Sequence, residues 1–414
     1  MNQFFCQMLM QASKLIHSDS FKTRNITSEK AFTRNRKLTF PVMISLLLDM
    51  LTRTMQIELD DFFFHVLDSS SVTKQAFFKA RKNILPTAFQ ELFELTRNLA
   101  FDNKKIKRFK GYHIFAIDGS ELRLEKNRSN QEYFKSRTNA ANNKTNARVS
   151  ILYDVLSGFA IDAKIGSLDV CERDFAMQNL ASFKGKFDEK DIVIFDRGYP
   201  SREMISYLSD MNCKYLMRLQ RSAFKGVNEN PSSDFRIDIK YHKNTYSVRV
   251  VRVILDTGEV ETLITNLDEK EFHTNEFKKL YFMRWGVETA FDTLKNKLLI
   301  EKFAGRSPIA VMQEFYAMMF ILNCLAAMKL TVDRKLKTAK SDCKYSYQGN
   351  LNLMIGYFKY RIPMMILYPH LIISTAKVLI RLCMRQPVPI ISDRSFPRPE
   401  FSHQRKVFCP KYAI

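Results

Sequence analysis

The chain has 414 residues; 46% are hydrophobic and only 12 are Gly and 12 Pro, which excludes a disordered or fibrous protein and leaves room for more than one domain. Its 65 basic and 43 acidic residues give a net charge of +22, which favours a polyanionic partner, nucleic acid before an anionic membrane surface. Seven scattered cysteines without a CxxC pair and seven dispersed histidines argue against structural zinc and favour a reducing compartment.

The positive charge is concentrated in the two end regions. Residues 1–110 carry +8 and residues 331–414 carry +11, whereas the 220 residues between them carry only +3. We expect the flanks to contact a polyanion and the middle to form a packed domain. The apolar stretches 309–328 and 363–380 are interrupted by polar residues, so they predict buried helices and no membrane partner. The first residues lack a signal-peptide pattern, and we expect a cytoplasmic protein.

Residues 1–110 predict a helical domain, because their apolar residues recur at helical spacing without strand alternation. The stretch "SSVTKQAFFKARKNILPTAFQELFELTRNL" predicts two helices broken near Pro86, the first capped by Ser71 or Thr73. A short basic helix after a capped turn is compatible with a DNA recognition helix, and a solvated basic face fits nearly as well. The cations on this first helix are Lys74, Lys79, Arg81 and Lys82.

After the helical domain the pattern changes to strands alternating with helices. "YHIFAIDGSELRL" predicts an apolar strand that ends at Asp118, followed by a turn at Gly119–Ser120. Residues 147–166 predict a hairpin, and residues 191–201 predict a buried strand that ends at Asp196. The order β-β-β-α-β-α-β predicts a mixed sheet flanked by helices, which is an α/β fold.

Residues 221–264 break this alternation with several short strands, and predict a β-rich insertion ahead of a long helix that begins near Asn275. The chain is helical again after Met328. We therefore predict three domains: a helical N-terminal DNA-binding domain (1–110), an α/β domain (111–330) and a basic helical C-terminal region (331–414).

Three carboxylates are candidate metal ligands. Asp118 and Asp196 each close an apolar run, and ligands gather at the carboxyl ends of strands in open sheets. A single Asp before Gly is more often a turn residue, but two buried carboxylates repel each other unless a cation neutralises them. Glu288 lies on a helix expected to pack on the same sheet, with Asp292 as a rival. Carboxylates suit Mg²⁺ or Mn²⁺, and two ions about 4 Å apart would activate a water or a 3′-hydroxyl at a phosphodiester.

One stripe of the predicted helix 281–299 carries two cations, an aromatic residue and an acid. At about 3.6 residues per turn, these side chains project within an arc of roughly 60°. Phosphate contacts by Arg284 and Lys295, with Tyr281 bonding or stacking, would explain their position beside Glu288. The alternative, a surface i,i+4 ion pair, explains Arg284 alone.

These residues resemble the DDE transposases of bacterial insertion sequences, in the group with a Tyr-Arg-Glu-Lys signature. The matching elements are "AIDGS", "VIFDRGYPS" and Y-x2-R-x3-E-x6-K, with "RW" before the Glu. The resemblance extends over roughly residues 30–330, including "F-x-R-x-R-x-L" at Phe32–Leu38 and the "SVTKQAFFKAR" helix. It implies a ribonuclease-H-like catalytic domain whose β-rich insertion precedes the catalytic Glu.

The resemblance also implies roles for single residues. Asp118, Asp196 and Glu288 resemble the metal-binding catalytic triad, which selects Glu288 over Asp292. Trp285 points off the stripe and is expected in the core. The residues that resemble contacts to DNA phosphates are Tyr281, Arg284 and Lys295, with Arg197 as a further DNA-facing residue.

The implied chemistry is hydrolytic nicking at the 3′ end followed by strand transfer to target DNA, with two Mg²⁺ or Mn²⁺ ions. The implied partners are double-stranded DNA, as transposon ends and as target, and a second copy of the chain in a synaptic homodimer. The implied location is the bacterial nucleoid. Two alternatives remain open: a metal-dependent endonuclease of the same fold without strand transfer, and a DNA-binding protein derived from an inactive transposase.

Overall fold

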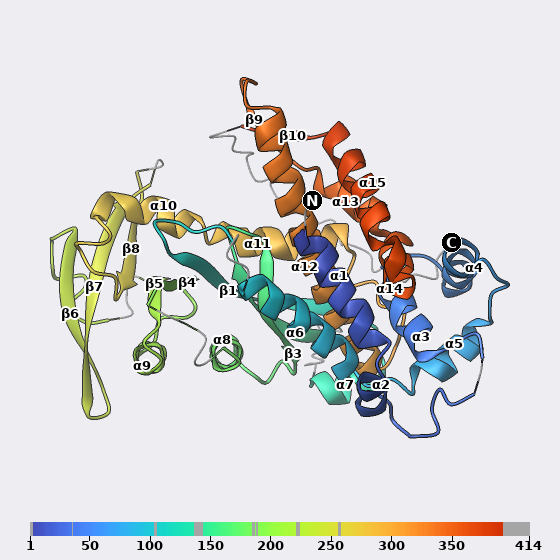
Figure 1. The fold of residues 1–414 in the computed structure, drawn as a ribbon. Coiled ribbons are helices and arrows are strands. Elements are labelled where there is room, and N and C mark those ends of the chain that lie inside the picture. The colour runs from blue at the N-terminus through green and yellow to red at the C-terminus, as the bar shows by residue number, and fades with distance from the viewer. Residues whose placement is uncertain are drawn as a thin grey trace. The chain divides into compact units, whose positions relative to one another are not determined.

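The computed structural model describes residues 3–34, 36–102, 106–135, 144–183, 187, 189–220, 224–255 and 258–391. The chain forms two compact units (Figure 1). The central unit comprises residues 101–293, and the helical unit comprises residues 1–100 together with 294–414. The three-domain division made from the sequence stays a prediction beside this description. The end of the basic tail, beyond residue 391, lies outside the described residues.

The central unit is built on one eight-stranded mixed sheet, with strand order β3-β2-β1-β4-β5-β8-β7-β6. β1 pairs antiparallel with β2 and parallel with β4, and β4 pairs parallel with β5. This is the ribonuclease-H-like α/β arrangement that the resemblance implied. The strands are β1 (His113–Leu124), β2 (Thr145–Asp154), β3 (Phe159–Gly166), β4 (Asp191–Phe195), β5 (Lys214–Arg218), β6 (Asp234–Tyr241), β7 (Asn244–Ile254) and β8 (Val260–Thr265).

The helices of the central unit cover both faces of the sheet. α8 and α9 lie on one face, and α10 and α11 lie on the other (Figure 1). The predicted β-rich insertion supplies β6, β7 and β8, which lengthen the same sheet beyond β5. The helical elements are α7 (Arg128–Phe134), α8 (Glu172–Ala181), α9 (Arg202–Asp210), the 3-10 helix η1 (Thr274–Glu276), α10 (Phe277–Phe282) and α11 (Trp285–Asp292).

The predicted turn at Gly119–Ser120 is wrong, because β1 runs straight through these residues. Asp118 is paired with Ile151 and Gly119 with Ser150, so β2 satisfies the backbone of β1 along this whole segment. On its other side, β1 pairs with β4 only as far as Ala116. Asp118 therefore lies within a strand, yet just beyond the point where the neighbouring parallel strand ends.

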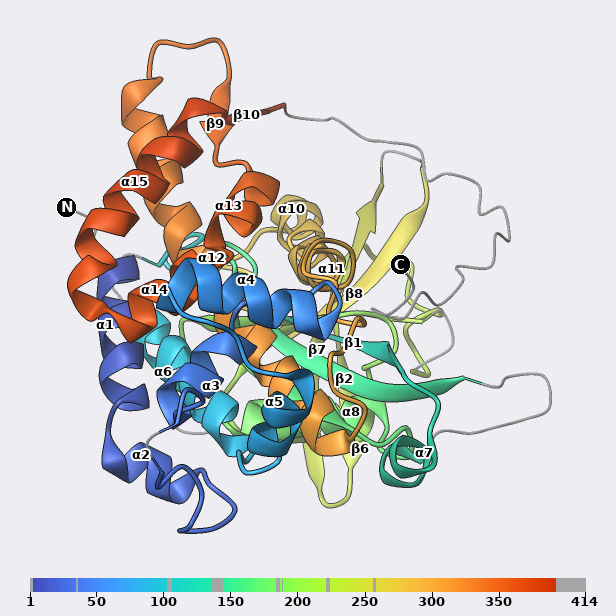
Figure 2. The same cartoon turned by 90° about the vertical axis from the view of Figure 1, so that its right-hand side faces the viewer.

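The helical unit contains most of the long helices of the chain (Figure 2). As predicted, the helix pair in the N-terminal region is broken at Pro86, and Thr73 caps the first helix by accepting a hydrogen bond from the Ala76 amide. The elements are α1 (Gln3–Ile16), α2 (Asp19–Arg24), α3 (Phe40–Leu47), α4 (Met55–Leu67), α5 (Lys74–Arg81), α6 (Thr87–Phe101), α12 (Pro308–Ala339), α13 (Leu351–Phe358), α14 (Arg361–Leu367), the 3-10 helix η3 (Pro369–Leu371), α15 (Ile372–Arg385) and the short strands β9 (Ser346–Gln348) and β10 (Val388–Ile390).

Helix α12 forms the centre of the helical unit. It is long and apolar enough to cross a membrane, but 94% of its most apolar window is buried inside the protein. Helices α1, α13 and α15 pack against it. The second apolar stretch, 363–380, is divided at Tyr368–Pro369 between α14 and α15. Both stretches are therefore packed helices, as their polar interruptions predicted.

Candidate active site

The sheet and α11 bring three carboxylates of the central unit together. Asp118 is half-buried in β1, and its Oδ1 accepts a hydrogen bond of 2.9 Å from the Gly119 amide. Asp196 directly follows β4, the parallel neighbour of β1. Glu288 lies on α11, which packs on β1 and β2. Two adjacent strands and one helix thus supply one acid each.

The charges of these acids act on one another. Burial raises the pKa of Asp118 to about 6, and the negative charges of Glu288 and Asp196 add to this effect. The Gly119 amide and the Arg284 guanidinium oppose it. The three carboxylates therefore share one electrostatic environment, which disfavours a full set of negative charges in the absence of a cation.

Two residues of the predicted stripe hold the carboxylates in this structure. The Tyr281 hydroxyl donates to Asp196 Oδ1 at 3.1 Å, and Arg284 Nη2 donates to Glu288 Oε1 at 2.6 Å. Both side chains are buried, with only 6% and 5% of their surface exposed. The Nε of Arg284 is buried and has no hydrogen-bond partner in the described part of the chain. Arg284 thus retains a donor in addition to the group that binds Glu288.

The continuous helix assumed for residues 281–299 is wrong. α10 ends at Phe282, and i→i−3 hydrogen bonds such as Arg284 N to Tyr281 O form a tighter turn before α11 begins. After α11, residues Thr293–Lys297 form a π-helical turn. Gly286 permits a close approach to the sheet, because a Cβ at this position would lie 2.9 Å from Val155 Cβ. Tertiary packing therefore changes the helical geometry on both sides of Glu288.

Three further residues of this segment were judged from the geometry of a regular helix, and the structure places them as follows. Trp285 was predicted in the core, but 40% of its surface is exposed, and the Arg284 guanidinium lies 5.5 Å from the centre of its ring. Asp292 is exposed, and the acids with the largest effect on the pKa of Asp118 are Glu288 and Asp196. Lys295 is half-buried in the π-helical turn. Its predicted phosphate contact stays a prediction.

The structure adds a fourth acid that the sequence reasoning missed, Glu172 in the first turn of α8. A Cβ built on Gly119 would lie 3.2 Å from Glu172 Cγ and Cδ, and one built on Gly198 would lie 4.0 Å from Glu172 Oε2. Both glycines follow Asp118 or Asp196 within two residues and leave room for the Glu172 side chain. Beside them, the Tyr199 hydroxyl is buried without a hydrogen-bond partner among the described residues. The sequence signal was the Gly after each Asp, which we interpreted only as a turn.

A polar cavity of about 550 Å³ lies at β5 and β8, and its lining includes the residue that follows Asp196. Arg197, the predicted DNA-facing residue, is exposed and lines it together with Arg218. Arg218 forms an ion pair of 3.1 Å with Glu261, and its charge reaches Tyr281. Arg218 ends β5, and no motif in the sequence singled it out.

The donor chemistry fits a hard divalent cation. The hydrogen bonds described above use one oxygen each of Asp118, Asp196 and Glu288, and carboxylate oxygens are the ligands that Mg²⁺ and Mn²⁺ prefer. A cation would also offset the burial of Asp118 and its repulsion by Glu288 and Asp196, which together raise the pKa of Asp118. In the described part of the chain, however, no three His, Cys, Asp or Glu side chains are grouped closely enough to hold an ion in this structure.

The predicted basic side of α5 is partly wrong, because Arg81 is buried. Its guanidinium forms an ion pair of 2.8 Å with Glu314 on α12 and also donates to Gln313 and to the Ala310 carbonyl. Arg81 therefore stabilises the helical unit instead of facing solvent. The exposed cations of this segment are Lys74, Lys79 and Lys82.

The comparisons with known proteins identify the family of the chain. Residues 109–324, more than half of the chain, match the family described as "Transposase DDE domain", and the chain belongs to this family. It is therefore a protein of the transposase class. Among solved structures, the chain is similar to a piggyBac transposase synaptic complex with hairpin DNA, determined by cryo-EM, with a TM-score of 0.47 and 10% identity over 90% of this chain and 81% of that one. A comparison with curated proteins finds no match.

Proposed function

We propose that this chain is the transposase of a bacterial insertion sequence, which binds the element ends, cleaves phosphodiester bonds by metal-dependent hydrolysis and joins the 3′ ends to target DNA. The observation that carries this proposal is the convergence of Asp118, Asp196 and Glu288 in one electrostatic environment, in a chain of the DDE transposase family. The Tyr-Arg-Glu-Lys signature supports it, since Tyr281 and Arg284 bind two of the three acids.

In this proposal Asp118, Asp196 and Glu288 hold two Mg²⁺ or Mn²⁺ ions. When bound, such ions activate the attacking oxygen and stabilise the leaving oxygen. Tyr281 orients Asp196 through its hydroxyl, at 3.1 Å. Arg284 binds and orients Glu288 through its Nη2, at 2.6 Å, and its charge favours a DNA phosphate beside the carboxylates.

The remaining predicted contacts complete the proposal. Arg197 lies on an exposed turn directly after Asp196. In this proposal its charge would contact the backbone of a DNA strand that enters the site. Lys295 is assigned a second phosphate contact. The partners are double-stranded DNA, both element ends and target, and a second copy of the chain in a synaptic homodimer. The site of action is the bacterial nucleoid.

The test is a cleavage and joining assay with oligonucleotides that carry the terminal repeats flanking the gene. We expect Mg²⁺-dependent 3′-end nicking and joining by the wild type, and none by Glu288→Gln. Asp292→Asn is the matched control, because it removes an exposed acid one helical turn away. Cleavage of arbitrary DNA without end-dependent joining would identify an endonuclease instead. DNA binding that survives in Glu288→Gln, with no joining by the wild type, would identify a non-catalytic DNA-binding protein.

A further inference from the structure

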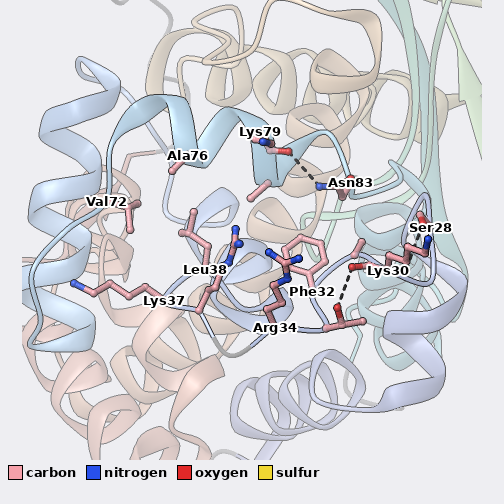
Figure 3. A pocket seen from close by; sticks show the side chains of 14 residues that line it. Ser28, Lys30, Phe32, Arg34, Lys37, Leu38, Val72, Ala76, Lys79 and Asn83 are labelled. Atoms are coloured by element: carbon pink, nitrogen blue, oxygen red, sulfur yellow. Dashed lines mark hydrogen bonds between the residues drawn. The ribbon is translucent and has the colours of Figure 1, made fainter.

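A large pocket in the helical unit joins two motifs that lie far apart in the sequence. It has a volume of about 610 Å³ and lies between the segment 28–38 and helix α5 (Figure 3). The segment contributes Phe32 and its neighbours, and α5 contributes one side that includes Ala76 and Lys79. The "F-x-R-x-R-x-L" stretch and the "SVTKQAFFKAR" helix thus form one site.

The pocket is strongly cationic. None of the residues that line it is acidic. Within the described part of the chain, the guanidinium groups of Arg34 and Arg36 form no hydrogen bond or ion pair, and the same holds for the amino group of Lys79. Unneutralised cations that face one cavity repel each other, so the pocket favours an anion. The cations of the lining are Lys30, Arg34, Arg36, Lys37 and Lys79.

Backbone hydrogen bonds hold the start of segment 28–38 against the end of α5. The Thr27 amide donates to the Asn83 carbonyl at 3.1 Å, and the Leu85 amide donates to the Asn25 carbonyl at 2.9 Å. Within the segment, the ring of Phe32 packs edge-on against Phe40 at 5.7 Å. These contacts fix the backbone that carries the cations in the absence of a ligand.

The far end of the segment is also tied down. Thr39 caps α3 through its side chain, and the Lys37 amino group donates to the Ser70 carbonyl at 2.8 Å. Lys22 Nζ donates to the Phe32 carbonyl at 3.2 Å. Since Lys37 is engaged in this way, Arg34, Arg36 and Lys79 are the cations best placed to receive a ligand.

We propose that this pocket binds the phosphodiester backbone of the DNA end, which rests on the proposed function. Guanidinium groups pair with phosphate oxygens in a planar, two-point geometry, and an ammonium adds a point charge. Because Arg81 is buried, Lys79 is the cation of α5 that joins the basic groups of segment 28–38 in the lining of this pocket. Contacts of this kind position DNA and carry no sequence information directly.

The experiment measures DNA binding by fluorescence anisotropy, in chelator, with an end duplex and an unrelated duplex. The variant is Arg34→Ala/Arg36→Ala. The matched control is Lys240→Ala/Lys243→Ala, which removes the same charge from the exposed β6–β7 hairpin. We expect the variant to weaken both duplexes by a similar factor, roughly 10- to 30-fold near 0.15 M salt, and to lower the slope of log K against log salt by about 1.8. The control should change neither quantity.

Several results would overturn the proposal. These are an unchanged salt slope in Arg34→Ala/Arg36→Ala, an equal effect in the control, or a loss confined to the end duplex, which would mean base readout. A separate arm adds inorganic triphosphate as competitor. If triphosphate binds the wild type and not the variant while both bind DNA equally, the pocket serves a free polyphosphate. Equal thermal unfolding midpoints of variant and wild type would show that folding is intact. Lys79→Ala alone should lower the slope of log K against log salt by about 0.9.

The proposed function and the pocket can fail separately. If the variant weakens DNA binding as expected but the wild type joins no ends, the pocket stands and the transposition proposal fails. If the wild type joins ends and the variant binds DNA normally, the pocket proposal fails and the active-site assignment is untouched.

Discussion

Replacing Arg81 by Ala should destabilise the helical unit much more than it affects DNA binding. The Arg81 side chain is 4% exposed, and its guanidinium makes bonds of 2.7 Å to Gln313 Oε1, 2.8 Å to Glu314 Oε1 and 2.8 Å to the Ala310 carbonyl. Glu314 in turn accepts from the amides of Ala304 and Gly305. Every strong donor and acceptor of this network is therefore satisfied.

Removing one partner of a buried ion pair leaves the other charged and unpaired, which costs about 3–5 kcal/mol. For a unit of this size, each kcal/mol lowers the unfolding midpoint by roughly 2–4 °C, so Arg81→Ala should lower it by about 6–20 °C. Arg81→Lys keeps the positive charge but loses the planar guanidinium that binds three partners. Its unfolding midpoint should lie between those of the wild type and Arg81→Ala. Lys82→Ala, at an exposed neighbouring position, is the control and should change the midpoint little.

The assay is thermal and urea denaturation followed by circular dichroism, with DNA binding of the folded protein measured in parallel. We also expect Arg81→Met/Glu314→Leu to recover part of the loss of Arg81→Ala, because no lone charge remains buried. The reasoning is refuted if Arg81→Ala costs less than about 1 kcal/mol, or if folded Arg81→Lys binds DNA as weakly as Lys79→Ala. The second result would show that Arg81 faces DNA.

Three further predictions concern the carboxylate site. Asp118→Asn should stabilise the metal-free protein by about 1–3 kcal/mol at pH 8 and by nothing at pH 3.5. The pKa of Asp118 is about 6 in the folded protein and 3.8 ordinarily, so the wild type loses stability as the pH rises from the lower value through the higher one, whereas Asn does not titrate. Equal effects in urea titrations at both pH values would contradict this. Gly119→Ala should cost roughly 1 kcal/mol through contact with Glu172, and Gly119→Ala/Glu172→Ala should recover it in a double-mutant cycle. Tyr281→Phe should weaken Mn²⁺ binding by roughly 10–100-fold in calorimetry, since it removes the hydrogen bond to Asp196; an unchanged affinity would mean that Tyr281 has no part in orienting Asp196.

Local patterns in the chain were sufficient for much of the fold. The continuous apolar run before Asp196 predicts β4, and the two runs around Ser157–Gly158 predict the β2–β3 hairpin. Pro86 separates α5 from α6, and Thr73 caps α5, because these effects act within a few residues. The candidate acids were found in the same way, since each Asp closes an apolar run.

Other features depend on contacts between residues that are distant in the chain, and local patterns missed them. Gly119 suggested a turn, but pairing with β2 keeps β1 extended through it. Arg81 has the sequence pattern of a surface cation, but in the structure it is buried in an ion pair with Glu314, more than two hundred residues later. Trp285 suggested core packing, yet it is exposed beside Arg284.

The residues around Glu288 show most clearly which features local sequence determines and which depend on tertiary contacts. Amino-acid types and spacing are properties of the sequence alone, and they brought Tyr281, Arg284 and Glu288 to attention together. Which atoms they bind was decided by the tertiary structure: the tight turn before α11 places the Tyr281 hydroxyl on Asp196 and the Arg284 guanidinium on Glu288. Hydrophobic periodicity depends on side chains a few residues apart, whereas a hydrogen bond between residues 85 positions apart exists only once the sheet and the helix have packed.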